Sequence, residues 1–140
     1  MSPINILIAD DHAMVRSGLR RILEGEAGLR VIGEAEDGRS TLAALELQTP
    51  DLLMLDLSMP GMDGFELARH LRLCSPPPAL VAMTGWGTAT DRQRCEAAGF
   101  AAHIVKPAQI TDIEAVLARV MDDRAQARPA DQRAERRRTC

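Results

Sequence analysis

Short apolar runs alternate with amphipathic segments along most of this chain. The runs, such as INILIA at residues 4–9, read as strands, whereas the segments between them carry apolar residues at helical spacing, as Val15, Leu19 and Leu23 do. Alternation of this kind predicts right-handed β-α-β units. It therefore predicts an α/β fold in which helices cover both faces of a parallel sheet.

The apolar runs predict five strands, at Ile4–Ala9, Val31–Ala35, Leu52–Leu55, Ala79–Met83 and Ala102–Val105. The amphipathic segments predict five helices, at Ala13–Leu23, Ser40–Leu47, Gly64–Leu73, Thr90–Ala98 and Ile110–Met121. Short apolar segments do not distinguish strand from helix well, so the pattern leaves strand and helix open for the second strand and the second helix.

Residues 1–121 form one predicted domain, and residues 122–140 form a predicted polar, disordered tail. After Asp122 the chain has no large apolar residue, and it contains Pro129 and an arginine run at 136–138. Those arginines could contact an acidic partner or nucleic acid, but a solvated tail is the simpler interpretation.

The composition excludes several classes of protein. A chain of 140 residues that is 46% hydrophobic can build a core, and a net charge of −3 argues against nucleic acid as a direct partner. No apolar run approaches the length of a membrane helix, and no secretory signal is present. The three cysteines, Cys74, Cys95 and Cys140, match no metal or redox spacing, so the reducing cytoplasm is the simplest location.

Polar side chains stand at the ends of four predicted strands. Asp10 and Asp11 follow the first strand, Asp56 the third, Thr84 the fourth and Lys106 the fifth. In a parallel α/β sheet the carboxyl ends of the strands meet at one edge, where ligands bind. We therefore expect these five side chains to line one site.

Three carboxylates in one site raise each other's pKa, and a cation relieves the repulsion. An all-oxygen site with open positions suits Mg²⁺. Lys106 is the only lysine among the 17 lysine and arginine residues, so its compact ammonium is expected to matter at that position. The set predicts a phosphate-handling site with an aspartate available as a nucleophile. In the alternative, the acids are solvated strand-end carboxylates, and Asp10 or Asp11 caps the first helix.

Four motifs carry a family resemblance: "IADDH", "LLMLDLSMPGMDG", "AMTG" and "IVKP". Together, and in this order, they resemble the receiver domain of bacterial two-component response regulators over about residues 4–121. The resemblance implies a five-stranded parallel sheet in the order 2-1-3-4-5 with five flanking helices, as in flavodoxin-like folds. It also implies a signalling switch that is phosphorylated on an aspartate rather than an enzyme with a substrate of its own.

The resemblance implies a role for each acid of the site. Asp56 would be the phosphoacceptor, attacking phosphohistidine on a sensor histidine kinase or a histidine phosphotransfer protein. Asp11 and Asp56 would bind Mg²⁺ directly and Asp10 mostly through water, while the backbone carbonyl of Ser58 would complete the protein ligands. The metal ligands would therefore be Asp10, Asp11, Asp56 and Ser58, whereas the catalytic residues would be Asp56, Thr84 and Lys106.

The remaining site residues would act on the phosphoryl group. Thr84 would donate a hydrogen bond to it, and Lys106 would pair with one of its oxygens. The Lys106-Pro107 peptide bond would be cis, which would help to aim the lysine, and Met59-Pro60-Gly61 would shape the loop around the site.

Two positions vary among relatives, those of Ser58 and Trp86, and His103 departs from the residue that is usual in the family. Ser58 and Trp86 flank the path of the hydrolytic water, and we predict that Trp86 shields the acyl phosphate and slows its loss. The alternative is a tryptophan that only packs over the fourth helix. His103 stands where relatives carry the Tyr or Phe that follows the threonine inward on phosphorylation. A histidine there is smaller and can titrate, or it is simply a surface residue on an edge strand.

Phosphorylation would switch the face made by residues 90–98, 102–105 and 110–121, for partner binding, homodimerisation or phosphoryl relay. The chain would be a single-domain regulator unless it is part of a longer one. "AAGFAAHIVKP" resembles receivers of hybrid kinases or stand-alone regulators, whereas "DDHAMVRSGLRRIL" resembles receivers that precede a helix-turn-helix. Two other functions compete: an Mg²⁺-dependent phosphohydrolase with an aspartate nucleophile, and a degenerate receiver that binds partners without phosphate.

Overall fold

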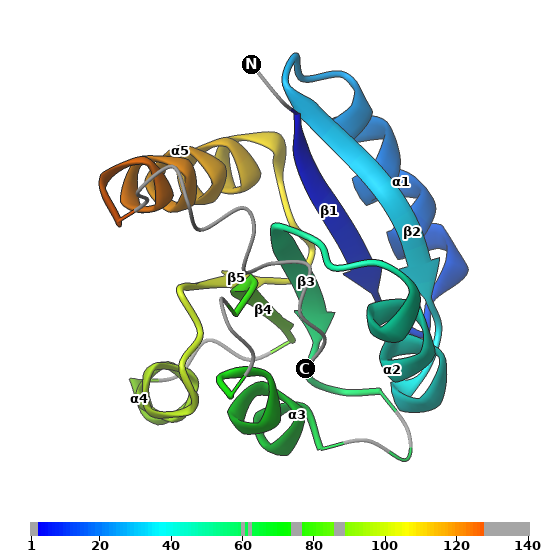
Figure 1. The fold of residues 1–140 in the computed structure, drawn as a ribbon, viewed down its shortest axis with the longest axis vertical. Helices are drawn as coiled ribbons and strands as arrows, with labels where there is room; N and C mark the ends of the chain where they lie inside the picture. Colours follow the sequence, from blue (N-terminus) through cyan, green and yellow to red (C-terminus); the bar gives the residue numbers. More distant parts are fainter. Residues whose placement is uncertain (1–2, 60, 62, 74–76, 86–88, 128–140) are drawn as a thin grey trace.

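The computed structural model describes residues 3–59, 61, 63–73, 77–85 and 89–127 of the chain, and strands and helices alternate along them (Figure 1). The strands are β1 (Ile4–Ala9), β2 (Leu29–Ala35), β3 (Leu52–Asp56), β4 (Ala79–Thr84) and β5 (Ala102–Val105). The helices are α1 (Ala13–Glu24), α2 (Gly38–Leu47), α3 (Gly64–Leu71), α4 (Ala89–Ala98) and α5 (Ile110–Ala127). All ten predicted elements are present, and their bounds differ from prediction by at most two residues, except at the end of α5.

The five strands form one parallel sheet in the order β2-β1-β3-β4-β5, which confirms the predicted α/β fold. The chain adds β2 on one side of β1 and then builds β3, β4 and β5 on the other side. The reversal of direction lies between β1 and β3, at the point where open α/β sheets bind ligands. The carboxyl ends of β1 and β3 are therefore neighbours at one edge of the sheet.

The sheet separates two apolar cores, because successive side chains of a strand point to opposite faces. On β3, Leu53 and Leu55 pack into the core with α2, α3 and α4, whereas Leu52 and Met54 pack into the core with α1 and α5 (Figure 1). All five residues of β3 are buried. A strand buried on both faces requires the continuous apolar run that the sequence shows.

Local side-chain bonds fix where α2 begins. The Asp37 carboxylate accepts the backbone N–H of Ser40, and the Ser40 hydroxyl accepts the backbone N–H of Asp37. This reciprocal capping box starts the helix at Gly38, two residues before the predicted start. By contrast, the N-cap residue of α1 is His12 rather than Asp10 or Asp11, and its side chain makes no capping bond to that helix.

Helix α3 begins close to the segment that follows β3, near the edge of the sheet. Asp63 caps this helix by accepting the backbone N–H groups of Phe65 and Glu66. Gly64 is buried, and a Cβ atom added to it would lie only 2.7 Å from the Cδ2 atom of Leu57. The absence of a side chain at residue 64 therefore lets α3 pack against the chain that leaves β3.

Helix α5 continues to Ala127, six residues beyond its predicted end at Met121. The segment DDRAQA lacks large apolar residues, but Ala, Arg and Gln favour helix and no proline interrupts the chain before Pro129. The predicted tail from 122 to 140 therefore begins with helix, and its residues 128–140 lie outside the described part. Among the described residues, no helix is both long and apolar enough to span a membrane.

Candidate functional site

The expected polar side chains do gather at the carboxyl edge of the sheet. Asp10 and Asp11 directly follow β1, Asp56 is the last residue of β3, Thr84 is the last residue of β4, and Lys106 directly follows β5. Backbone bonds hold these strand ends in register, because the N–H of Lys106 donates to the Thr84 carbonyl at 2.8 Å. Parallel strands thus deliver residues far apart in sequence to one place.

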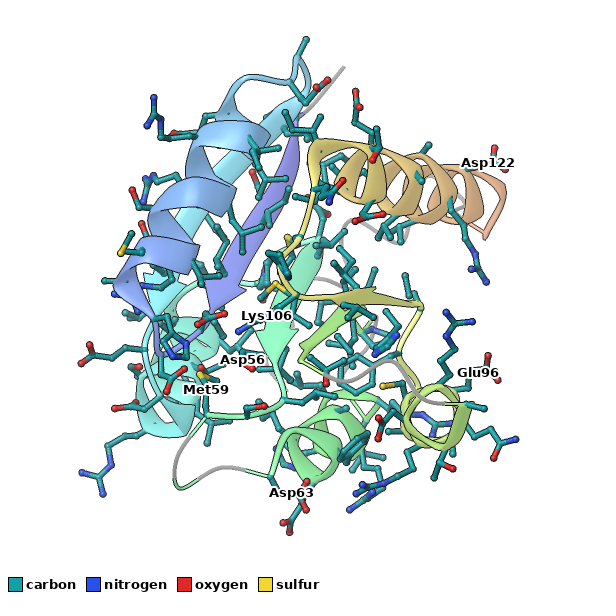
Figure 2. All side chains as sticks on the ribbon, turned by 180° about the vertical axis from the view of Figure 1, so that it is seen from behind. Asp56, Met59, Asp63, Glu96, Lys106 and Asp122 are labelled. Atoms are coloured by element: carbon teal, nitrogen blue, oxygen red, sulfur yellow. The ribbon has the colours of Figure 1, made fainter. Side chains whose placement is uncertain are left out.

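Lys106 joins two buried carboxylates. Its Nζ atom lies 2.7 Å from Oδ2 of Asp10 and 3.0 Å from Oδ2 of Asp56, and Figure 2 shows Lys106 and Asp56 side by side. The Asp10 side chain is 0% exposed and that of Asp56 is 1% exposed. One ammonium therefore pairs with two buried carboxylates. The cluster of Asp10, Asp56 and Lys106 keeps an excess of negative charge.

Backbone groups satisfy other acceptor positions of the two acids. Oδ1 of Asp56 accepts the N–H of Ser58 at 2.9 Å, and Oδ1 of Asp10 accepts the N–H of His12 at 2.8 Å. The Arg16 guanidinium donates to the backbone carbonyl of Asp10 at 2.6 Å and also pairs with Glu34. These bonds hold both carboxylates in place at the start of the loops that follow β1 and β3.

Burial and the two ion pairs of Lys106 both shift the pKa values of this cluster. Burial raises the pKa of Asp56, and the neighbouring charge of Asp10 adds to this effect, while bonds from Ser58 and Lys106 work against it. Burial alone would lower the pKa of Lys106, but its bonds to Asp10 and Asp56 outweigh burial and raise that pKa. Since one ammonium faces two buried carboxylates, a further cation beside them would reduce the excess of negative charge.

Four side chains lie close enough to share one metal ion. Ligand atoms of Asp10, Asp11, His12 and Asp56 all lie within 4.8 Å of one another. The carboxylates of this group are the hard oxygen donors that Mg²⁺ prefers, so the acids fit such an ion. Ser58, the other predicted ligand, is held beside Asp56 by its N–H bond.

His12 is the member of this group that the sequence-based prediction missed. Its Nδ1 atom lies 3.0 Å from Oδ1 of Asp11 and 3.3 Å from Oδ1 of Asp10, although the side chain is 65% exposed. The only indication in the sequence is that His12 directly follows Asp10 and Asp11. A residue that follows two strand-end acids could equally have pointed away from them.

A pocket of about 390 Å³ opens at the same edge of the sheet, lined by Leu57, Ser58, Asp63, Phe65, Thr84, Asp91 and Arg94. It brings the buried Thr84 together with Ser58, two residues beyond Asp56. The guanidinium of Arg94 lies over the ring of Phe65 at 4.2 Å, and the wall of this pocket carries this one base and two acids, Asp63 and Asp91. A larger pocket of about 710 Å³ lies between α2 and α3, but neither Asp56 nor Lys106 lines it.

Other predicted features can be located or set aside. The Lys106-Pro107 peptide bond is cis, as predicted. His103 lies on the edge strand β5 but is only partly exposed, and its Nε2 atom is buried, so it is not a free surface residue. Its role as a switch stays a prediction. Trp86 and Pro60 lie outside the described residues.

Comparison with known proteins gives one consistent family. The chain matches the family model of the response regulator receiver domain over residues 6–118. It is 33% identical over 133 residues to the cyclic di-GMP phosphodiesterase response regulator RpfG of Xanthomonas campestris, a match that covers 94% of this chain and 35% of RpfG. Several of the curated relatives are much longer proteins, of which the chain spans 26% to 37%.

Solved structures agree with this family. The CheY-like receiver domain protein of Methanospirillum hungatei superposes with a TM-score of 0.80 at 26% identity, covering 91% of this chain and 100% of that one. The receiver domain of AraT, a response regulator of Geobacillus stearothermophilus, has a TM-score of 0.78 at 31% identity and covers 88% and 96%. The chain therefore belongs to the response regulator receiver domain family of two-component signalling.

Proposed function

We propose that this receiver domain is an Mg²⁺-dependent phosphoacceptor, phosphorylated on Asp56 by a sensor histidine kinase or a histidine phosphotransfer protein. The observation that carries the proposal is the position of the Asp56 carboxylate. It stands at the end of β3, 3.0 Å from the Lys106 ammonium and within one potential ion site with Asp10 and Asp11. Membership of the receiver family supports the same assignment.

The proposed reaction is a single phosphoryl transfer. One oxygen of the Asp56 carboxylate attacks the phosphorus of a phosphohistidine on the donor protein. A P–O bond forms as the P–N bond breaks, and the electron pair returns to the donor's imidazole nitrogen, which takes up a proton from solvent. Hydrolysis later reverses the modification: water attacks the phosphorus, and the products are inorganic phosphate and the free carboxylate of Asp56.

Asp10, Asp11, Asp56 and the backbone carbonyl of Ser58 are the residues that would hold the Mg²⁺ ion. When bound, the ion neutralises phosphoryl oxygens and the charge that develops on them during transfer. The charge count supports this assignment, because the single ammonium of Lys106 faces two buried carboxylates, Asp10 and Asp56.

Lys106 and Thr84 would act on the phosphoryl group itself. Lys106 already contacts Asp56, so its ammonium needs only a small shift to pair with a phosphoryl oxygen once Asp56 is modified. Thr84 is buried at the end of β4 and lines the pocket that also contains Ser58. Its hydroxyl would donate a hydrogen bond to the phosphoryl group and so link phosphorylation to the position of β4.

The proposed output surface consists of α4, β5 and α5. Val105 on β5 is 40% exposed and Ile110 at the start of α5 is 55% exposed, so this surface offers apolar side chains to a partner. Phosphorylation would shift an equilibrium between two conformations of this surface, and the favoured conformation would act in partner binding, homodimerisation or phosphoryl relay. Direct binding of nucleic acid is not part of this proposal, and a cytoplasmic location fits cysteines that match no disulfide or metal spacing.

The chain would be no enzyme toward other molecules, beyond its own phosphorylation and dephosphorylation. A phosphohydrolase of the haloacid dehalogenase type would use a second aspartate two residues after the nucleophile as its general acid. Here that position is Ser58, whose hydroxyl cannot serve as such an acid. Turnover of an aryl phosphate ester by the purified protein would contradict this assignment.

Labelling by a small phosphodonor tests the proposal directly. Wild-type protein incubated with acetyl phosphate and Mg²⁺ should gain one phosphoryl group by mass spectrometry, and removal of Mg²⁺ should abolish the gain. Asp56→Asn should not be labelled, while its circular dichroism stays that of the wild type. Asp122→Asn is the matched control, because Asp122 is exposed on α5, away from Asp56 in Figure 2, and it should be labelled normally. Equal labelling of Asp56→Asn and the wild type would overturn the assignment.

A further inference from the structure

We propose that His12 contributes its Nδ1 atom as a further protein ligand of the ion site, and thereby biases the site toward borderline transition-metal ions such as Co²⁺, Ni²⁺ and Zn²⁺. The inference rests on the proposed function in that it concerns the ion site beside Asp56. It goes further, because it assigns a ligand and a metal preference that a carboxylate-only site would not have.

The position of the imidazole is the first argument. A ring nitrogen of His12 belongs to the same group of ligand atoms as Asp10, Asp11 and Asp56, all within 4.8 Å of one another. The side chain of His12 is 65% exposed and has room to point into solvent. Its Nδ1 atom nevertheless lies beside two carboxylates. The backbone reinforces this placement, since the His12 N–H is bonded to Asp10.

The spacing of the donor atoms is the second argument. Metal–nitrogen and metal–oxygen bonds are about 2.1 Å long, so neighbouring ligand atoms are about 3.0 Å apart in an octahedral site and about 3.4 Å apart in a tetrahedral one. His12 Nδ1 lies 3.0 Å from Oδ1 of Asp11 and 3.3 Å from Oδ1 of Asp10. These separations are those of ligands on the edges of one coordination polyhedron. The three side chains need little rearrangement to share an ion.

The chemistry of the donor atoms determines which ion is bound more tightly when His12 is a ligand. Mg²⁺ is a hard ion that prefers carboxylate, carbonyl and water oxygens, so an imidazole adds little to its binding. Co²⁺, Ni²⁺ and Zn²⁺ bind neutral imidazole strongly, and histidine is a common ligand for them. His12 should therefore strengthen the binding of these ions selectively, while the aspartates hold either kind of ion.

A different role for His12 makes the opposite prediction. If Nδ1 only donates a hydrogen bond or a positive charge to Asp10 and Asp11, it competes with every cation at the site. Removal of the side chain would then strengthen Mg²⁺ and Co²⁺ binding by similar factors. The two roles are distinguished by the ratio of the two affinities rather than by either affinity alone.

Titration calorimetry of the unphosphorylated protein measures this ratio. Mg²⁺, Co²⁺ and Ni²⁺ should each be titrated into the wild type, into His12→Ala and into His70→Ala, above the ordinary histidine pKa of about 6.5. His70 is an exposed histidine of α3 and is the matched control. We expect His12→Ala to weaken Co²⁺ and Ni²⁺ binding by about tenfold or more, and Mg²⁺ binding by less than about twofold. His70→Ala should match the wild type.

A spectroscopic measurement gives an independent readout. Electron paramagnetic resonance of bound Cu²⁺ should show coupling to a ligand nitrogen in the wild type, and that coupling should be lost in His12→Ala. An unchanged Co²⁺-to-Mg²⁺ affinity ratio in His12→Ala, or an unchanged nitrogen coupling, would overturn the inference.

The failure of this inference and the failure of the proposed function give different results. If the wild type is labelled at Asp56 with Mg²⁺ but the metal ratio does not depend on His12, only the role of His12 is wrong. If Asp56 is never labelled, the proposed function is wrong, and the calorimetry still shows whether His12 is a ligand.

Discussion

The ammonium of Lys106 lies 3.0 Å from the carboxylate of Asp56, although β4 separates the strands that carry the two residues. Neighbouring strands are about 4.8 Å apart, so the two side chains and the contact between them together span roughly 10 Å of the sheet edge. The same Nζ atom also contacts Asp10, at the end of β1. A single side chain thus connects three strand ends before any ligand is bound.

Removal of the Lys106 charge should destabilise the protein in the absence of metal. Lys106→Met keeps most of the apolar stem but leaves two buried carboxylates without their cation. We expect the free energy of unfolding to fall by about 3 kcal/mol in buffer that contains a chelator. Urea denaturation followed by circular dichroism measures this change.

Saturating Mg²⁺ should restore part of the loss in Lys106→Met, because a bound ion replaces the missing positive charge. Arg119→Met is the control, since Arg119 is exposed on α5 and its replacement should change stability by less than about 0.5 kcal/mol. A Lys106→Met protein as stable as the wild type without metal would show that the two ion pairs contribute nothing.

The ion pairs of Glu34 should make stability depend on pH in the acid range. A hydrogen bond from Arg20, helped by Arg16, holds the pKa of Glu34 below its ordinary value, although burial works in the other direction. The native state therefore binds the Glu34 proton more weakly than the unfolded state does. The resulting stabilisation, about 1 kcal/mol for a partly exposed pair, is present above the ordinary pKa of about 4.3 and is lost as the pH falls through the native pKa.

Glu34→Gln should remove this component of the pH dependence. Its free energy of unfolding should lie below that of the wild type at neutral pH, and the two should converge as the pH falls below 4.3 or so. Glu114→Gln, at an exposed position of α5, should follow the wild type throughout. Denaturation curves at several pH values test this, and a constant difference between Glu34→Gln and the wild type would contradict it.

A methyl group at residue 64 should disturb the segment that follows Asp56. In Gly64→Ala the new Cβ would lie 2.7 Å from Cδ2 of Leu57, so the Leu57 side chain must change its conformation or the segment must shift. We expect a loss of about 1 to 3 kcal/mol in the free energy of unfolding, and slower labelling of Asp56 by acetyl phosphate.

Gly18→Ala is the matched control for this substitution. Gly18 lies in the middle of α1, and a Cβ atom there would meet nothing within 4 Å. Alanine should stabilise the helix by about 0.5 to 1 kcal/mol and leave labelling unchanged. Equal effects of the two substitutions would show that packing against Leu57 is unimportant.

Trp86 should prolong the lifetime of the phosphorylated protein. It follows Thr84 by two residues, a position that flanks the path of the hydrolytic water in receiver domains. Trp86→Ala should release inorganic phosphate several times faster than the wild type after the phosphodonor is removed, whereas Trp86→Phe should stay close to the wild type. An unchanged lifetime in Trp86→Ala would mean that the indole only packs.

The fold and most of the candidate site could be predicted because both follow from periodicity. The alternation of apolar runs with amphipathic segments requires a parallel sheet, and a parallel sheet places the carboxyl ends of its strands at one edge. Residues that stand at strand ends, such as Asp10, Asp56 and Lys106, must then be neighbours. Chain order and strand length carry this information without any knowledge of side-chain conformation.

What could not be predicted depends on choices among local conformations. The part of α5 after Met121 consists of residues that are also common in solvated tails. Only weak helix propensities distinguish a helix from a tail there. The start of α2 at Gly38 depends on the side chains of Asp37 and Ser40, which form the capping box only if both adopt the required rotamers.

The sequence by itself determined which charges reach the edge of the sheet, since strand ends follow from the hydrophobic pattern. Only the tertiary structure decided how those charges are shared: Lys106 between Asp10 and Asp56, and His12 beside Asp11. The physical reason is that each buried charge must find a partner once water is removed, and the partners come from strands far apart in sequence. Their distances exist only after the sheet has formed.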